Sequence, residues 1–276
     1  TRWQVHSTYC CPVNVARTIA SLHTWAYSSS ENAVWVHLYG GSRLRTELPD
    51  GAPVALLQET DYPWDGRVKL TVKEAPEGKI ALHLRIPGWT DEATVRVNGS
   101  RIDATPQPGS YLAVRRRWQE GDIVELNLPM RVRLMEAHPA AGNLDGKVAV
   151  MRGPVVYCLE LPKKMGGKET WDKGVYLPAN ATLEPEHRPE MLGGVTVLEG
   201  TALTSEGRNR FREMNPAKRV DEAIWSSELY QEYSRPAQEL EMPEKATVDI
   251  TLIPYYAWAN RGVSFMEVWI PLAREE

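Results

Sequence analysis

The sequence predicts a mainly β protein in which one helix precedes two β-sandwich domains. Short runs rich in β-branched and aromatic residues recur from residue 33 onward, separated by turn residues at the spacing of antiparallel sandwiches. One segment near the start has helical spacing instead. We therefore expect a helical segment at 1–31, a first β-sandwich domain at 32–135 and a second at 136–276.

The predicted helix runs from Pro12 to about Tyr27. Proline suits the first turn because its missing N–H would be unpaired there in any case. The apolar residues that share one face are Val15, Ile19, Leu22 and Ala26. Ser28-Ser29-Ser30 is expected to end the helix. A single helix of this length is marginal in water, so we expect helical partners upstream, in a longer protein cut before Thr1.

Strands are predicted wherever alternating or β-branched runs lie between turn residues. The predicted strands are 33–39, 54–60, 68–73, 79–86, 94–97, 111–115, 123–128, 132–135, 148–151, 155–161, 246–253 and 264–270. Asn98-Gly99 after the strand at 94–97 predicts a tight hairpin turn. Residues 162–245 are polar, contain prolines and show weak periodicity, so no strand is assigned there.

Composition excludes several classes of function. The 276 residues carry 36 acidic and 32 basic side chains, a net charge of −4 that is mixed along the chain. No basic face for nucleic acid is indicated, and no run approaches the roughly 20 apolar residues that span a bilayer. Three cysteines, two of them adjacent, do not make the usual disulfide framework of a small secreted protein and leave the compartment open.

The adjacent cysteines, Cys10 and Cys11, are the strongest chemical signal. They precede Pro12 at the predicted helix start, where free N–H groups and the helix dipole favour a thiolate. Such a thiolate can act as a nucleophile or bind a metal, and vicinal cysteines can present two sulfurs to one zinc ion. The alternative is a pair of buried, reduced cysteines that only pack.

Several short motifs, taken together in this order, resemble glycoside hydrolase family 127, the β-L-arabinofuranosidase-like enzymes. The motifs are Cys10-Cys11-Pro12-Val13-Asn14-Val15-Ala16-Arg17, Val36-His37-Leu38-Tyr39, Asp61-Tyr62-Pro63-Trp64-Asp65-Gly66, Leu84-Arg85-Ile86-Pro87-Gly88-Trp89, Val97-Asn98-Gly99, Gly153-Pro154-Val155-Val156-Tyr157 and Ile253-Pro254-Tyr255-Tyr256-Ala257-Trp258-Ala259-Asn260-Arg261-Gly262. The resemblance covers nearly the whole chain, and the ordered combination is specific.

The resemblance implies an (α/α)6 barrel followed by β-sandwich domains, of which this chain holds the last barrel helix and the sandwiches. It implies zinc held by a Glu and three cysteines, with Cys10 as both nucleophile and zinc ligand and Cys11 as zinc ligand. The implied reaction is retaining hydrolysis of an arabinose-containing plant glycan. The general acid/base, the zinc Glu and the third zinc Cys lie upstream, so this chain alone is expected to be inactive.

Other residues and functions remain as alternatives. His6 could line a sugar pocket, although a solvent-facing or capping role is equally compatible with its place before Cys10. Cys158 and four other histidines (His37, His83, His138 and His187) are expected to be structural, and aromatic residues near strand ends (Tyr62, Trp64, Trp89 and Trp118) to pack in the core rather than stack on sugars.

At the level of the whole chain, the alternatives are a non-catalytic β-sandwich module that supports a barrel or binds glycan, and a redox or metal-sensing dithiol. An apolar surface that faces the missing barrel would predict either self-association of the chain alone, as a homo-oligomer, or a requirement for the missing barrel.

Overall fold

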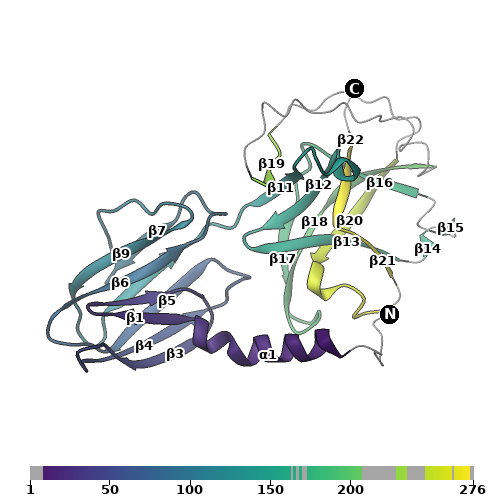
Figure 1. Cartoon of the computed structure of the whole chain (residues 1–276). Helices are drawn as coiled ribbons and strands as arrows, with labels where there is room; N and C mark the ends of the chain where they lie inside the picture. The colour runs from purple at the N-terminus through teal and green to yellow at the C-terminus, as the bar shows by residue number, and fades with distance from the viewer. Residues whose placement is uncertain are drawn as a thin grey trace. The chain divides into compact units, whose positions relative to one another are not determined.

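A computed structural model gives the architecture of the chain (Figure 1). It describes residues 9–162, 164–165, 168–169, 173–206, 228–234, 246–262 and 264–273. The chain forms two compact units that divide between Met130 and Arg131. We call residues 9–130 the N-terminal unit and the described residues from 131 onward the C-terminal unit. Strands dominate both units, which confirms the mainly β class.

Helix α1 spans Cys10–Trp25, so it begins and ends slightly earlier than predicted. The prediction that Ser28-Ser29-Ser30 ends the helix is wrong, because α1 already ends at Trp25 and the serines belong to strand β1 (Tyr27–Ser30). β1 pairs antiparallel with β2 (Ala33–Val36), and backbone pairing with this apolar neighbour overrides the low strand propensity of serine. Within the part of the chain that the structure describes, no helix is long and apolar enough to cross a membrane.

The N-terminal unit is a β-sandwich of two sheets. The four-stranded sheet has the order β1-β2-β6-β9, with β6 at Lys79–Ile86 and β9 at Ser110–Arg117. The six-stranded sheet has the order β3-β4-β5-β10-β7-β8. Its strands are β3 Ser42–Glu47, β4 Pro53–Thr60, β5 Arg67–Glu74, β7 Thr94–Val97, β8 Ser100–Arg101 and β10 Ile123–Asn127. Inward-facing residues of both sheets, such as Leu82 and Leu70, share one buried core.

The predicted Asn-Gly hairpin is confirmed and is tied to the rest of the sandwich. Asn98 and Gly99 have positive φ angles of 51° and 77° between β7 and β8. Asn98 Nδ2 donates a hydrogen bond to Asp122 Oδ1 at 2.8 Å, and Asn98 Oδ1 accepts one from the Ile123 N–H at 2.8 Å. Asp122 Oδ2 accepts the Gln119 N–H at 2.9 Å. The buried Asp122 carboxylate therefore links two turns of the sheet.

Asp122→Asn is expected to destabilise the chain by about 1–3 kcal/mol at neutral pH, because it removes a buried, charge-assisted acceptor. Burial alone would raise the pKa of Asp122, but the Asn98 and Gln119 hydrogen bonds and the charge of Arg116 outweigh it and lower the pKa. The stabilising contribution of the ionised Asp122 carboxylate is thus fully present above the usual carboxyl pKa. It is lost as the pH falls through the lower pKa of the folded protein.

Urea unfolding of wild type and Asp122→Asn from pH 7 down to pH 3 measures this contribution. The difference in free energy of unfolding between the two proteins should be constant above the usual carboxyl pKa and become smaller below it. Glu77→Gln, at an exposed turn residue, is the matched control and should unfold like the wild type at every pH. Equal stabilities of wild type and Asp122→Asn at pH 7 would contradict the expectation.

Most described strands of the C-terminal unit belong to one continuous sheet with the order β19-β11-β12-β22-β16-β18-β20-β13-β21, and β17 adds to β18. The strands are β11 Val132–Ala137, β12 Lys147–Arg152, β13 Val155–Pro162, β16 Lys173–Pro178, β17 Glu184–Arg188, β18 Val195–Glu206, β19 Tyr230–Glu232, β20 Ala246–Pro254, β21 Ser264–Glu267 and β22 Trp269–Ala273. β14 (Lys164–Met165) and β15 (Lys168–Glu169) form a separate pair.

The strand pairings in the main sheet of this unit form a ring. β12 pairs with β11 along one edge, and along its other edge with β22 through Lys147–Ala149 and with β13 through Met151 and Arg152. Pairing therefore runs from β12 through β22, β16, β18, β20 and β13 back to β12. The sheet encloses a buried core that includes Val148, Tyr157, Leu198 and Leu252.

Strands β16, β17 and β18 lie in the region where no strand was assigned. β18 has 12 residues and alternates buried and exposed positions only in part, with Gly200 at its middle. A Cβ at position 200 would lie 2.6 Å from the Thr182 carbonyl oxygen. Position 200 therefore requires glycine, because the backbone at Thr182 approaches closely. The sequence alone does not distinguish such a strand glycine from a glycine in a turn.

Candidate functional site

The structure places Cys10 and Cys11 in the first turn of α1. Both are free, exposed thiols, and their Sγ atoms are 3.7 Å apart. No acidic residue lies in the first turn, and the side chain of the N-cap residue Tyr9 makes no capping hydrogen bond. The N-terminal N–H groups of α1 and the positive end of its dipole therefore lie beside the two sulfurs.

The sulfur separation fits two ligands of one metal ion. Zinc binds cysteine sulfur at about 2.3 Å with tetrahedral geometry, which puts two sulfurs on the same ion about 3.8 Å apart. The 3.7 Å between the Cys10 and Cys11 sulfurs matches this value. Among the described residues, no group of three or more His, Cys, Asp or Glu could complete a metal site. The pair thus offers half of a tetrahedral ligand set.

Two polar residues, Asn14 and Arg17, follow the cysteine pair along helix α1. One turn further on, Arg17 Nη1 donates a hydrogen bond to Asn14 Oδ1 at 3.0 Å. His6, the predicted sugar-pocket residue, lies outside the described residues. The structure therefore brings together two of the three predicted site residues.

The third cysteine has a different environment. Cys158 lies in β13 and is fully buried. Burial, with a smaller contribution from Glu160, raises the pKa of its thiol to about 12. Cys158 is therefore a protonated thiol at neutral pH, and it packs in the core as the sequence indicated.

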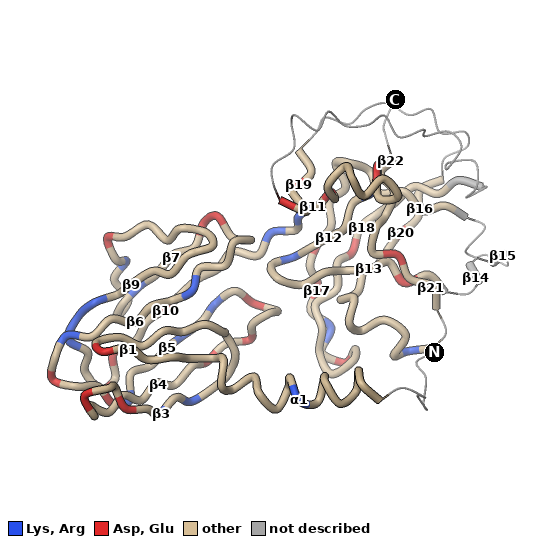
Figure 2. The backbone as a smooth tube through the Cα atoms, in the orientation of Figure 1, with Lys and Arg blue, Asp and Glu red and all other residues tan. Residues whose placement is uncertain are grey.

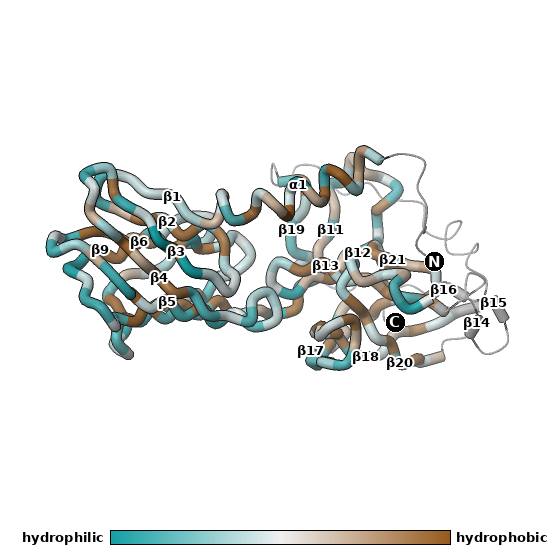
Figure 3. The backbone as a smooth tube through the Cα atoms, turned by 90° about the horizontal axis from the view of Figure 1, so that it is seen from below, coloured by the Kyte–Doolittle hydropathy of each residue, from teal (hydrophilic) through white to brown (hydrophobic). Residues whose placement is uncertain are grey.

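Helix α1 carries hydrophobic residues along its length (Figure 3), and its large apolar side chains are exposed. None of its residues is buried. The exposed large apolar residues of the helix are Val13, Val15, Ile19, Leu22 and Trp25, with exposed fractions of 44% to 64%. Val15, Ile19, Leu22 and Trp25 fall on one face at helical spacing, and a helix with such an apolar stripe normally packs against another element.

Three of the four aromatic residues predicted to pack rather than bind sugar, Tyr62, Trp89 and Trp118, are confirmed as part of the core. Trp118 is 4% exposed, and its Nε1 donates a hydrogen bond to the Ile80 carbonyl at 3.1 Å. Tyr62 and Trp89 are partly buried against the same core. His37 and His83 lie on the outer face of the four-stranded sheet, where His83 stacks on Trp35 and His37 meets Tyr111 edge-on.

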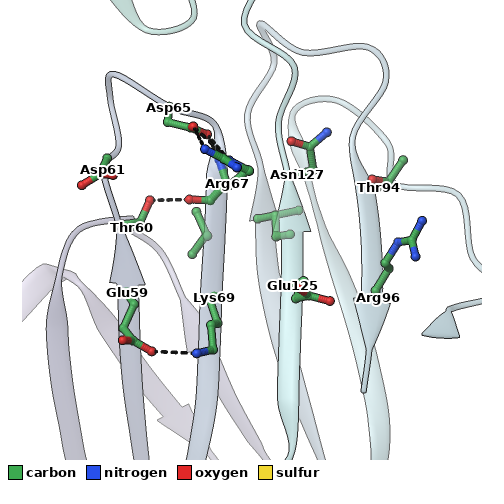
Figure 4. Close-up of a pocket in the computed structure, with 12 residues that line it drawn as sticks. Glu59, Thr60, Asp61, Asp65, Arg67, Lys69, Thr94, Arg96, Glu125 and Asn127 are labelled. Carbon is green, nitrogen blue, oxygen red and sulfur yellow. Dashed lines mark hydrogen bonds and ion pairs between the residues drawn. The ribbon is translucent and has the colours of Figure 1, made fainter. Parts of the chain in front are cut away.

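A depression of about 670 Å³ lies on the outer face of the six-stranded sheet (Figure 4). Cross-strand neighbours Glu59, Lys69, Glu125 and Arg96 alternate in charge across four strands. Glu59 and Lys69 form an ion pair at 3.2 Å, and no aromatic residue lines the depression. Alternating cross-strand charges stabilise a solvated sheet, so this face is best explained by structure alone. Both signs of charge are likewise mixed over the strands in Figure 2.

Comparison with known proteins adds to this geometry. Residues 33–130 match the beta-L-arabinofuranosidase GH127 middle domain, and residues 132–271 match the glycoside hydrolase family 127 C-terminal domain. The non-reducing end beta-L-arabinofuranosidase of Bifidobacterium longum subsp. longum is 32% identical over 94% of this chain and 36% of its own length.

Solved structures agree with these matches. A GH127 beta-L-arabinofuranosidase from Geobacillus stearothermophilus is 41% identical with a TM-score of 0.76, covering 100% of this chain and 39% of that one. A structure described as a glycoside hydrolase is 36% identical with a TM-score of 0.78, covering 99% and 42%.

The fold and the matches define a chain of the glycoside hydrolase class. Within that class, the chain belongs to glycoside hydrolase family 127. It spans between 36% and 42% of the lengths of these relatives.

Proposed function

We propose that this chain is the C-terminal part of a retaining, zinc-dependent β-L-arabinofuranosidase in which Cys10 is the nucleophile and Cys10 and Cys11 bind zinc. The observation that supports this proposal most directly is the 3.7 Å separation of two exposed sulfurs at a helix N-terminus. The names of the relatives support the sugar. The remaining zinc ligands and the general acid/base are proposed to come from other parts of the longer protein.

In this proposal, the residues of the chain hold and use a thiolate. Zinc, when bound, would supply positive charge that keeps both sulfurs deprotonated at neutral pH. The Cys10 sulfur attacks the anomeric carbon, the bond from that carbon to the leaving oxygen breaks, and an acid elsewhere protonates the leaving group. Water then displaces the sulfur. Two inversions at one carbon retain the configuration.

The exposed stripe of α1 supports the proposed place of the chain in the longer protein. Val15, Ile19, Leu22 and Trp25 lie along this stripe and are 44% to 64% exposed, and no residue of α1 is buried. We propose that they pack against helices of an (α/α)6 barrel formed by the preceding part of the protein. Such packing would hold the first turn, with Cys10 and Cys11, at the edge of that domain.

Zinc content tests the proposal. The complete protein, purified without chelator, should contain about one zinc per chain, and Cys10→Ser or Cys11→Ser should lose most of it because each removes one of four ligands. Cys158→Ala is the matched control, since the buried Cys158 offers no ligand, and it should retain the metal. Wild-type protein without zinc, or both serine variants with full zinc, would refute the proposal.

A further inference from the structure

The outer face of the four-stranded sheet of the N-terminal unit carries a group of ring side chains. We call Trp35, His37, His83 and Tyr111 the aromatic platform. Trp35 and His83 face away from the core, because their neighbours along the strands, Val34 and Leu82, are the buried residues. Tyr111 is 38% exposed, and the other three members are half-buried.

Strand register brings these rings together from distant parts of the sequence. Trp35 on β2 lies opposite His83 on β6, and β6 in turn pairs with β9, where Tyr111 lies opposite Arg85. The Trp35 and His83 rings stack with centroids 3.7 Å apart and an interplanar angle of 7°. Tyr111 meets Trp35 edge-on, with centroids 5.1 Å apart at 75°.

Hydrogen bonds fix the platform before any ligand arrives. His37 Nδ1 and Tyr111 Oη are 2.6 Å apart, and His37 Nε2 lies 2.8 Å from Ser28 Oγ. Trp35 Nε1 donates to Ser30 Oγ at 3.3 Å. Side chains held in this way lose little conformational entropy when they bind a ligand, which is a requirement for useful affinity on an open surface.

The rim of the platform supplies polar groups. Arg85 Nε donates to the His37 carbonyl at 2.7 Å, and its guanidinium carries further donors. Ser28 and Ala113, which lie opposite Trp35 and His83 on the outer strands, are small and exposed, so they leave room beside the stacked rings. Burial lowers the pKa of His83, which keeps the stacked imidazole neutral at neutral pH.

This combination of ring faces and hydroxyl or guanidinium groups matches the chemistry of a sugar. A sugar ring has an apolar face of C–H groups and a rim of hydroxyls that both donate and accept hydrogen bonds. The Tyr111 ring, which is 38% exposed, and the half-buried Trp35 ring offer apolar surface for the first, and the groups of Ser28, Tyr111 and Arg85 can bind the second. A wide apolar partner, such as a lipid surface, would gain little from a platform so closely rimmed by polar groups.

We propose that the aromatic platform is a glycan-binding surface that stacks on a neutral sugar residue of an arabinose-containing polysaccharide. The choice of arabinose rests on the proposed function, whereas the stacking does not. Because the platform needs neither zinc nor the cysteine pair, binding should be found in this chain alone and should persist in Cys10→Ser. Failure of this inference is therefore distinguishable from failure of the proposed enzyme activity.

Affinity electrophoresis of this chain tests the inference, with soluble arabinan, arabinoxylan and unbranched dextran as probes. Arabinan or arabinoxylan should retard the chain with a dissociation constant on the order of 0.1–1 mM, and dextran should retard it less. Tyr111→Ala and Trp35→Ala should each weaken binding about tenfold, since one aromatic contact is worth up to about 1.4 kcal/mol. Tyr111→Phe keeps the ring and should retain most of the affinity.

Tyr255→Ala is the matched control, because Tyr255 is an exposed aromatic residue of the other unit, and its binding should equal that of the wild type. Urea unfolding midpoints identify any variant that has lost its fold, and the exposed position of Tyr111 makes Tyr111→Ala the decisive one. The inference is overturned if no probe retards the chain, or if folded Tyr111→Ala migrates like the wild type. It is also overturned if the complete protein does not bind, which would show that the platform packs against another part of the molecule.

Discussion

Cys10→Ser is expected to lower kcat/KM of the complete protein for an aryl β-L-arabinofuranoside by at least about 10³-fold, as removal of a catalytic nucleophile does in other hydrolases. A serine hydroxyl remains protonated near neutral pH, so the helix N-terminus has no anion to present. A steady-state assay that monitors release of the aryl group measures this decrease in kcat/KM. Cys158→Ala should keep wild-type activity, because this residue lies fully buried in the core of the C-terminal unit.

A comparison of Cys11→Ser with Cys10→Ser distinguishes the role of zinc ligand from the role of nucleophile. Cys11→Ser keeps the Cys10 sulfur and weakens only metal binding, so excess zinc should restore part of its activity. The same addition should not restore Cys10→Ser. Mass spectrometry during turnover should also find one sugar residue attached to Cys10. Cys10→Ser activity within tenfold of the wild type would refute the assignment of the nucleophile.

Much of the fold could be predicted from local patterns. Strands such as β6 and β10 have one apolar face on the shared core, and this leaves a period of two in the sequence. β1 and β18 were missed for physical reasons that act at a distance. The serines of β1 are held by pairing with β2, and Gly200 of β18 is required by the Thr182 carbonyl.

The candidate sites also divide into one that local sequence reveals and one that depends on contacts between distant segments. Cys10 and Cys11 could be found because adjacency in the sequence already guarantees adjacency in space. The aromatic platform could not be found in this way. Trp35, His83 and Tyr111 come from three strands, and only the register of β2, β6 and β9 brings their rings into contact. Each of them alone is an ordinary half-exposed strand residue.

Gly66→Ala is expected to destabilise the chain by about 3 kcal/mol or more, in the range reserved for severe overpacking. Gly66 closes the Asp61–Gly66 motif just before β5. A Cβ there would lie 1.8 Å from the Leu128 carbonyl oxygen and 2.8 Å from its carbon. Leu128 is fully buried and its N–H donates to the Gly66 carbonyl at 2.9 Å, so neither backbone segment can move without breaking the pairing around β5 and β10.

Urea unfolding at neutral pH measures the effect, with Gly78→Ala as the matched control. A Cβ at Gly78 meets nothing within 4 Å, so this variant should stay within about 0.5 kcal/mol of the wild type. The contrast isolates close backbone approach from the general entropy change of replacing glycine. If the free energies of unfolding of Gly66→Ala and Gly78→Ala differ by less than about 1 kcal/mol, the backbone between β4 and β5 can pack in another way. Lack of space would then not explain the glycine at position 66.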